Sequence, residues 1–195
     1  ATGASTLAEV DEAVRVITST GNRNLAILQC ITNYPSKIES ANINVLKTYK
    51  QAFGAIMGYS DHTPGDMVVL GSIALGAKVI EKHFTLDKND IGPDHPHSMN
   101  PEEFAAMVKR VRDLEQALGS SRKEVVPEES ETVVVQRRGL YAKYAISRGQ
   151  VFTNENIVEL RPALGLLPKH KKDIINKDAK RDIAPGEPIN WSDVA

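Results

Sequence analysis

The stretch Gly58-Tyr59-Ser60-Asp61-His62-Thr63-Pro64-Gly65, together with Val79-Ile80-Glu81-Lys82-His83-Phe84, decides the fold. Each contains or follows a short apolar run, and residues 55–59 and 77–80 have the composition of buried strands. The segment between them, residues 65–76, has the length and the apolar content of one helix. A strand, a helix and a strand in this order predict two adjacent parallel strands.

A histidine follows the end of each of these two strands. His62 and His83 are therefore expected at the carboxyl edge of a parallel sheet, where α/β proteins bind their ligands. Two imidazoles that meet there are candidate ligands of a metal ion. The alternative is two unrelated histidines, one that caps a strand and one that is packed. Glu81 points to the same side of its strand as His83, where it can orient a ligand or pair with a lysine.

The first 119 residues continue this alternation of strands and helices. A further strand is expected over residues 25–31, and further helices over residues 7–17, 42–52 and 101–118. The last helix begins with Asn-Pro, a pair favoured at the cap and the first helical position, and a glycine follows it. Repeated strand–helix units of this kind predict an α/β domain with a parallel sheet.

Bulk properties exclude several classes of protein. The chain has 195 residues, 41% of them hydrophobic, and a formal net charge of −1, which argues against a nucleic-acid partner. The single cysteine, Cys30, excludes an intrachain disulfide and indicates a reducing compartment. No apolar run is long enough to span a membrane, and the start lacks a signal pattern. We therefore expect a cytoplasmic protein with no membrane partner.

The chain changes character after the long helix. Residues 120–136 are charged and weakly apolar, which predicts a linker between domains. Residues 137–195 contain short apolar runs broken by turn signals, typical of a small β-rich domain. Residues 145–152 and 182–189 resemble each other, each with an aliphatic residue, a glycine turn, a polar residue and a second aliphatic or aromatic residue.

Other polar residues are expected near the histidine edge. Residues 85–100 form a long connection after the second histidine strand, and loops of that length are functional or disordered. Asp94 in this loop can bind a polyol hydroxyl or assist proton transfer, or can belong to a solvated acidic loop. Thr32 and Ser60 lie at strand ends and can hold phosphate or carboxylate oxygens, or simply cap. Tyr34 can pack against a sugar ring or fill the loop.

Five short motifs in order resemble the sialic acid synthase family: Asn33-Tyr34-Pro35, Gly58 to Thr63, Ile80 to Thr85, Gly92-Pro93-Asp94 and Ser98 to Pro101. Members of that family condense phosphoenolpyruvate with N-acetylmannosamine or a related amino sugar. Their fold is a (β/α)8 TIM barrel followed by a small antifreeze-like (SAF) domain. The resemblance implies that residues 1–119 are the carboxyl-terminal half of the barrel, and that residues 137–195 are the SAF domain.

The resemblance also implies roles for individual residues. His62 and His83 resemble the two catalytic histidines that bind Mn²⁺ or Mg²⁺. Ser60 resembles a phosphoenolpyruvate contact, and Thr32 stands where the family pattern has an asparagine two residues before the tyrosine. The residues that resemble the amino-sugar contacts of the family are Tyr34, Asp94 and Arg161. In the family this arginine comes from the SAF domain of the partner subunit, which implies a domain-swapped homodimer.

Two other functions remain open at this point. One is a non-catalytic carbohydrate-binding or assembly module, in which residues 137–195 are the functional part. The other is a different barrel enzyme with a histidine-bound metal, such as an aldolase that needs no phosphoenolpyruvate. For the synthase, we expect residues 1–195 alone to be inactive, because the resemblance places the other half of the phosphate-binding edge outside them.

Overall fold

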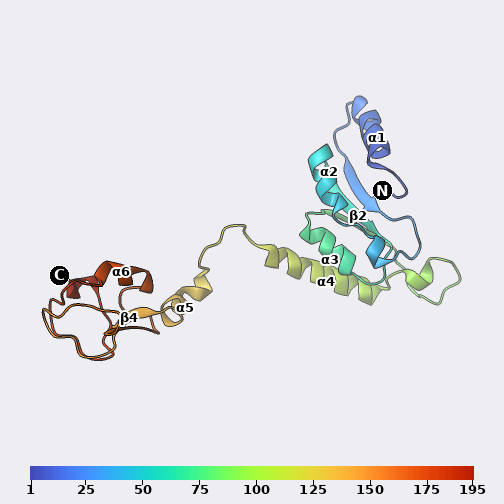
Figure 1. The fold of residues 1–195 in the computed structure, drawn as a ribbon. Helices are drawn as coiled ribbons and strands as arrows, with labels where there is room; N and C mark the ends of the chain where they lie inside the picture. The colour runs from blue at the N-terminus through green and yellow to red at the C-terminus, as the bar shows by residue number, and fades with distance from the viewer. The chain divides into compact units, whose positions relative to one another are not determined.

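The computed structural model describes residues 1–195, which form two compact units, Ala1–Ser120 and Ser121–Ala195 (Figure 1). None of the helices has the length and apolar character needed to cross a bilayer. The first unit alternates helices and strands, as the sequence predicts. Its elements are α1 (Leu7–Ser19), β1 (Ala26–Cys30), α2 (Val45–Phe53), β2 (Ile56–Asp61), α3 (Met67–Ala74), β3 (Val79–Lys82) and α4 (Pro101–Leu118).

The sheet of the first unit has the strand order β1-β2-β3, and both pairings are parallel. Successive side chains of a strand point to opposite faces, so the register defines two faces. Ile27, Met57, Tyr59 and Ile80 belong to one face and pack among apolar side chains of the helices. The helices therefore cover this face, as in a (β/α) barrel, where the helices lie outside.

The opposite face of the sheet is partly open. Leu28, Gly58 and Val79 share one row across it, and Cys30, Ser60 and Glu81 share the next. Val79 exposes 37% of its surface, an unusual value for a strand of a parallel sheet. This is the face that lines the inside of a barrel, and its polar row lies next to the carboxyl ends of the strands.

Local sequence explains where the helices begin. Thr6 and Glu9 form a capping box at α1, and Asn100, the predicted cap of α4, forms another with Glu103. Helix α2 starts three residues later than expected because Asn42 has a φ of 48°, which a right-handed helix does not allow. Strand β3 also starts two residues later than expected, because the chain first leaves α3 through Gly76 at a φ of 99°.

The second unit is built around a compact core of its own. Strands β4 (Gly139–Ala142) and β5 (Ile157–Leu160) pair antiparallel, and α6 (Lys171–Ile174) is a single helical turn. The side chains of Leu140, Phe152, Ile174 and Ile189 are fully buried in this core. This part of the unit also has 3-10 turns at Pro168–His170 and Trp191–Asp193.

The two similar segments of the second unit pair with each other. Ile146 and Ile183 exchange both backbone hydrogen bonds, at 3.0 and 2.8 Å. Gly149 and Gly186 take the same left-handed conformation, with φ of 81° and 78°. The side chains that follow them act alike, because Gln150 accepts from the Ser147 amide and Glu187 accepts from the Ala184 amide, both at 2.9 Å. The sequence similarity thus corresponds to two equivalent turns.

The segment that precedes this core contains regular structure. Residues 120–136 were expected to be a linker, and they include a 3-10 turn at Pro127–Glu129 followed by α5 (Ser130–Val135). Val134 accepts a hydrogen bond from the Ala163 amide through its carbonyl oxygen, at 2.9 Å. The helical part of the segment is therefore attached to the second unit.

Candidate metal and substrate site

The two predicted histidines meet at the carboxyl edge of the sheet. Asp61 and Lys82 are the last paired residues of β2 and β3, so His62 and His83 are the next residue on each strand. Their ring centroids lie 5.0 Å apart, with the ring planes at 83°. Metal–imidazole bonds are about 2 Å long, so this separation suits one cation bound between the two rings. The role of the two histidines as metal ligands stays a prediction.

A buried ion pair fixes the strand ends just before these histidines. Lys82 Nζ lies 2.7 Å from Asp61 Oδ2, and the two side chains are only 2% and 0% exposed. The ammonium also donates to the carbonyl oxygens of Thr63 and Gly65, and Asp61 Oδ1 accepts from the backbone amide and hydroxyl of Thr63. The turn after His62 is thereby held against β3.

The hydrogen bonds of His62 determine its tautomer. Its Nδ1 lies 2.8 Å from the carbonyl oxygen of Ile31 and 3.9 Å from Cys30 Sγ. A carbonyl oxygen only accepts, so Nδ1 carries the hydrogen and Nε2 carries the lone pair. This arrangement is the usual one for metal-binding histidines, which donate their second ring hydrogen to a carbonyl or carboxylate. His62 is buried, so its ring has little freedom to turn.

His83 is less buried than His62, and its backbone connects the end of β3 to the loop that follows. Its carbonyl oxygen accepts from the Met99 amide at 2.9 Å, which closes the loop of residues 85–100 onto β3. Burial, and then the charge of His62, lower the pKa of the His83 imidazole, while Asp94 opposes this change. The ring is therefore neutral at neutral pH, the form in which an imidazole binds a metal.

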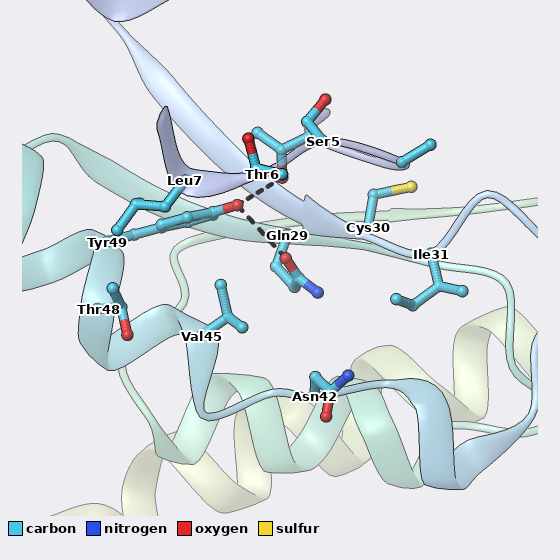
Figure 2. Close-up of a pocket in the computed structure, with 12 residues that line it drawn as sticks. Ser5, Thr6, Leu7, Gln29, Cys30, Ile31, Asn42, Val45, Thr48 and Tyr49 are labelled. Atoms are coloured by element: carbon cyan, nitrogen blue, oxygen red, sulfur yellow. Dashed lines mark hydrogen bonds between the residues drawn. The ribbon is translucent and has the colours of Figure 1, made fainter. Parts of the chain in front are cut away.

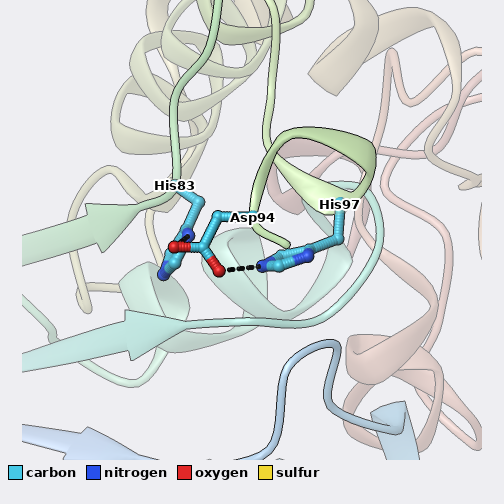
Figure 3. A group of neighbouring side chains, drawn as sticks. All are labelled: His83, Asp94 and His97. Carbon is cyan, nitrogen blue, oxygen red and sulfur yellow. Dashed lines mark ion pairs between the residues drawn. The ribbon is translucent and has the colours of Figure 1, made fainter. Parts of the chain in front are cut away.

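The loop brings two further groups to His83, as Figure 3 shows. Asp94 Oδ2 lies 3.8 Å from His83 Nδ1, and Asp94 Oδ1 lies 4.0 Å from His97 Nε2. One ligand atom from each of the three residues lies within 4.8 Å of the others. Asp94 is a predicted site residue, whereas no role was predicted for His97. The sequence signal for His97 was the run Asp94-His95-Pro96-His97, because its 3-10 turn brings Asp94 and His97 near His83.

Tyr34 lies over the histidines. Its ring centroid is 4.2 Å from that of His62, 5.4 Å from His83 and 6.2 Å from His97. The tyrosine side chain is half exposed, so one side of its ring remains open to a ligand. Tyr34 therefore lies beside the histidines, and its predicted contact with a sugar stays a prediction.

The three other predicted residues differ in how they relate to this site. Ser60 is buried, and its hydroxyl donates to Glu81 Oε1 at 2.6 Å, so Glu81 pairs with a serine and not with a lysine. Thr32 is exposed on the loop after β1. Arg161 is exposed in the second unit, directly after β5.

A separate hollow of about 500 Å³ lies beside β1 (Figure 2). The Tyr49 hydroxyl at its wall is 2.8 Å from Thr2 Oγ1 and 3.4 Å from Gln29 Oε1. Gly3 follows Thr2, and a Cβ there would lie 2.0 Å from Thr32 Oγ1. A larger residue at position 3 would therefore require the Thr32 side chain to move. The hollow itself is lined by none of the predicted site residues.

Two family profiles match the two parts of the chain. The profile of the NeuB family matches residues 1–123. The chain belongs to the NeuB family. The profile of the SAF domain matches residues 137–195. The fold is therefore a NeuB-type α/β domain followed by a SAF domain, as predicted from the motifs.

Individual NeuB relatives match almost the whole chain. An uncharacterized protein of Methanocaldococcus jannaschii is 44% identical over 193 residues, which cover 99% of this chain and 57% of that protein. N,N'-diacetyllegionaminic acid synthase of Campylobacter jejuni is 36% identical over 190 residues, with coverages of 96% and 57%. The chain thus spans somewhat more than half the length of these relatives.

A solved structure has the same architecture. The crystal structure of the spore coat polysaccharide biosynthesis protein spsE from Bacillus subtilis superposes with a TM-score of 0.57 at 34% identity. The match covers 98% of this chain and 59% of that chain.

Proposed function

We propose that the protein is a nonulosonic acid synthase. It condenses phosphoenolpyruvate with an N-acylated mannosamine-type sugar and releases phosphate, in the cytoplasm. One observation carries the proposal: in a NeuB-family chain, two histidines meet with ring centroids 5.0 Å apart at the carboxyl ends of adjacent parallel strands. The similarity to a legionaminic acid synthase supports the same class of reaction.

The residues present fit a divalent cation, Mn²⁺ or Mg²⁺. His62 offers a lone pair on Nε2 because its Nδ1 hydrogen is donated to Ile31. His83 has a lowered pKa, so its ring is free of a competing proton at neutral pH. A cation held by these two rings supplies Lewis-acid polarisation of the aldehyde oxygen of the open-chain sugar.

The chain's own polar residues bind and orient the two substrates. We assign Thr32 and Ser60 to phosphoenolpyruvate. The hydroxyl of the exposed Thr32 can donate to its phosphate and carboxylate oxygens, whereas that of Ser60 must first turn away from Glu81. Tyr34 packs against the sugar, and Asp94 accepts a hydrogen bond from one of its hydroxyls. Holding both substrates at one edge converts a reaction between two molecules into one within a complex.

The bonds made and broken are as follows. The methylene carbon of phosphoenolpyruvate forms a bond to the aldehyde carbon of the sugar, whose oxygen becomes a hydroxyl after protonation. Water adds to the former enol carbon and loses a proton. The bond between that carbon and the bridging oxygen then breaks, so phosphate leaves and a keto acid remains.

We assign separate tasks to the parts of the chain. Residues 1–119 carry the histidine edge, residues 120–136 connect the domains, and residues 137–195 form the SAF domain that presents Arg161. A guanidinium donates hydrogen bonds in a fixed geometry, which suits the N-acyl oxygen of the sugar. We place Arg161 in the site of the partner subunit of a domain-swapped homodimer.

Phosphate release tests the proposal. The full-length protein is incubated with phosphoenolpyruvate, Mn²⁺ and a panel of N-acylated hexosamines, and free phosphate is measured. We expect release with at least one mannosamine-type sugar and none without sugar. His83→Gln should abolish release, whereas His170→Gln in the SAF domain is a matched control that should retain it. Absence of release with every sugar would contradict the proposal.

A further inference from the structure

One buried nitrogen at the histidine edge has no partner. His97 Nε2 is a buried polar atom that makes no hydrogen bond, and the whole side chain is only 9% exposed. A buried polar group without a partner costs about 1–3 kcal/mol, so such atoms are rare unless a ligand binds them. The nearest charged atom, Asp94 Oδ1, is 4.0 Å away, which is too far for a hydrogen bond.

The position of this nitrogen relative to His83 is that of a co-ligand. The ring centroids of His83 and His97 are 5.0 Å apart, the same separation as that of His62 and His83. One ligand atom from each of His83, Asp94 and His97 lies within 4.8 Å of the others (Figure 3). Atoms bound to one first-row ion lie about 3–4 Å apart, since each bond is about 2 Å long.

The turn that carries His97 is fixed by other residues. Ser98 donates its amide and its hydroxyl to the Asp94 carbonyl oxygen, at 3.1 and 2.7 Å. The neighbouring His95 uses its Nδ1 on the Thr85 hydroxyl, 2.7 Å away. Of the two histidines in this turn, only His97 thus has a free, buried nitrogen that is directed to the site.

We propose that His97 is a further nitrogen ligand of the cation bound at His83. This inference rests on the proposed function, because it extends the same metal site. The Asp94 carboxylate lies between the two rings and offsets the charge of the ion. Imidazole nitrogens suit first-row transition ions, whereas Mg²⁺ prefers oxygen ligands and retains water. With His97 as an added ligand, the site therefore favours a transition ion over the Mg²⁺ that the histidine pair alone also admits.

Metal binding without substrates tests the inference. The metal-free full-length protein is titrated with Co²⁺, and visible absorption reports its ligands. We expect His97→Gln to weaken Co²⁺ binding at least about tenfold, as is typical for lost groups at metal sites. The control is His95→Gln, which changes the same turn and should bind like the wild type. Millimolar Mg²⁺ should not displace Co²⁺ from the wild type.

The outcomes separate this inference from the proposed function. If His62→Gln and His83→Gln weaken binding but His97→Gln matches the wild type in affinity and spectrum, the role of His97 is wrong and the predicted pair stands. If neither His62→Gln nor His83→Gln weakens binding, the metal site of the proposed function is itself wrong. Pulsed electron paramagnetic resonance of the wild-type Mn²⁺ complex needs no variant, and coupling to only two imidazole nitrogens would also overturn the inference.

Discussion

Asp61 and Lys82 form a fully buried ion pair, 2.7 Å long, between the last paired residues of two neighbouring strands. Each precedes one of the two site histidines. The pair therefore joins the strand ends at the point where the distance between His62 and His83 is set. A buried charge whose partner is removed costs about 3–5 kcal/mol, whereas removal of both charges is much less harmful.

We expect Lys82→Met to destabilise the first unit by about 3–5 kcal/mol, because the carboxylate of Asp61 stays buried without its partner. The double substitution Asp61→Asn and Lys82→Met should recover most of that loss. Urea unfolding followed by circular dichroism measures both. The single tryptophan, Trp191, lies in the second unit, so its fluorescence transition is an internal control that should not move. Additive effects of the two substitutions would contradict the predicted coupling.

The acid titration of His83 gives a second prediction. In the metal-free protein its imidazole should titrate below the ordinary histidine pKa, since burial and His62 lower it. At pH values between the lowered pKa of the folded state and the ordinary pKa of the unfolded state, the unfolded chain holds the proton and the folded chain does not. The contribution of His83 to the free energy of unfolding is therefore fully present above the ordinary pKa, and it is lost as the pH falls through the range between the two pKa values.

Two substitutions should move this pKa in opposite directions, as measured by nuclear magnetic resonance of the ring protons. Asp94→Asn removes a charge that raises the His83 pKa, so the midpoint should fall further. His62→Gln removes a ring that lowers the His83 pKa when it is protonated, so the midpoint should rise. Shifts in the same direction for both variants would be inconsistent with this account.

Gly58 provides a third prediction. A Cβ there would lie 2.5 Å from the Val79 carbonyl oxygen and 2.8 Å from Leu28 Cγ. Because the first of these is backbone in the neighbouring strand, Gly58→Ala should destabilise the first unit by about 1–3 kcal/mol. The matched control is Gly71→Ala in α3, where the added carbon meets only the flexible end of Ile43. Thermal unfolding should show a clear loss for Gly58→Ala and little loss for Gly71→Ala.

The proposed exchange of domains gives a fourth prediction. Arg161→Ala and His83→Gln should each be inactive as homodimers. A mixture unfolded and refolded together should recover about a quarter of wild-type phosphate release, because half of the dimers are mixed and each contains one intact site. If Arg161 served the site of its own subunit, the mixture would remain inactive.

Much of the fold was accessible from the sequence because its signals are local. The start of α4 at Asn100, the parallel strands and the position of both histidines after their strands follow from residue pattern and spacing. Element boundaries were less accurate where backbone conformation decides them. Asn42 at positive φ delayed one helix, and the segment expected to be a linker contains a short helix that attaches to the second unit.

The site was predicted only in part, for a physical reason. His62 and His83 directly follow two paired strands, and the pairing makes their proximity predictable. His97 lies on a loop, where no periodicity reports the direction of a side chain. The partners of Ser60 and Lys82 are cross-strand neighbours, Glu81 and Asp61, and are known only once the register is known.

The pairing of Ile146 with Ile183 has a consequence for how the SAF domain holds together. Each of the two equivalent turns closes on its own side chain, and the Ile146–Ile183 pair joins the segments that lead into them, so neither half of the domain contains this pairing by itself. Proteolysis at the exposed Lys169, which lies between them, would yield two pieces that stay associated. Expressed apart, these pieces would behave as a split protein that regains its shape only when both are present.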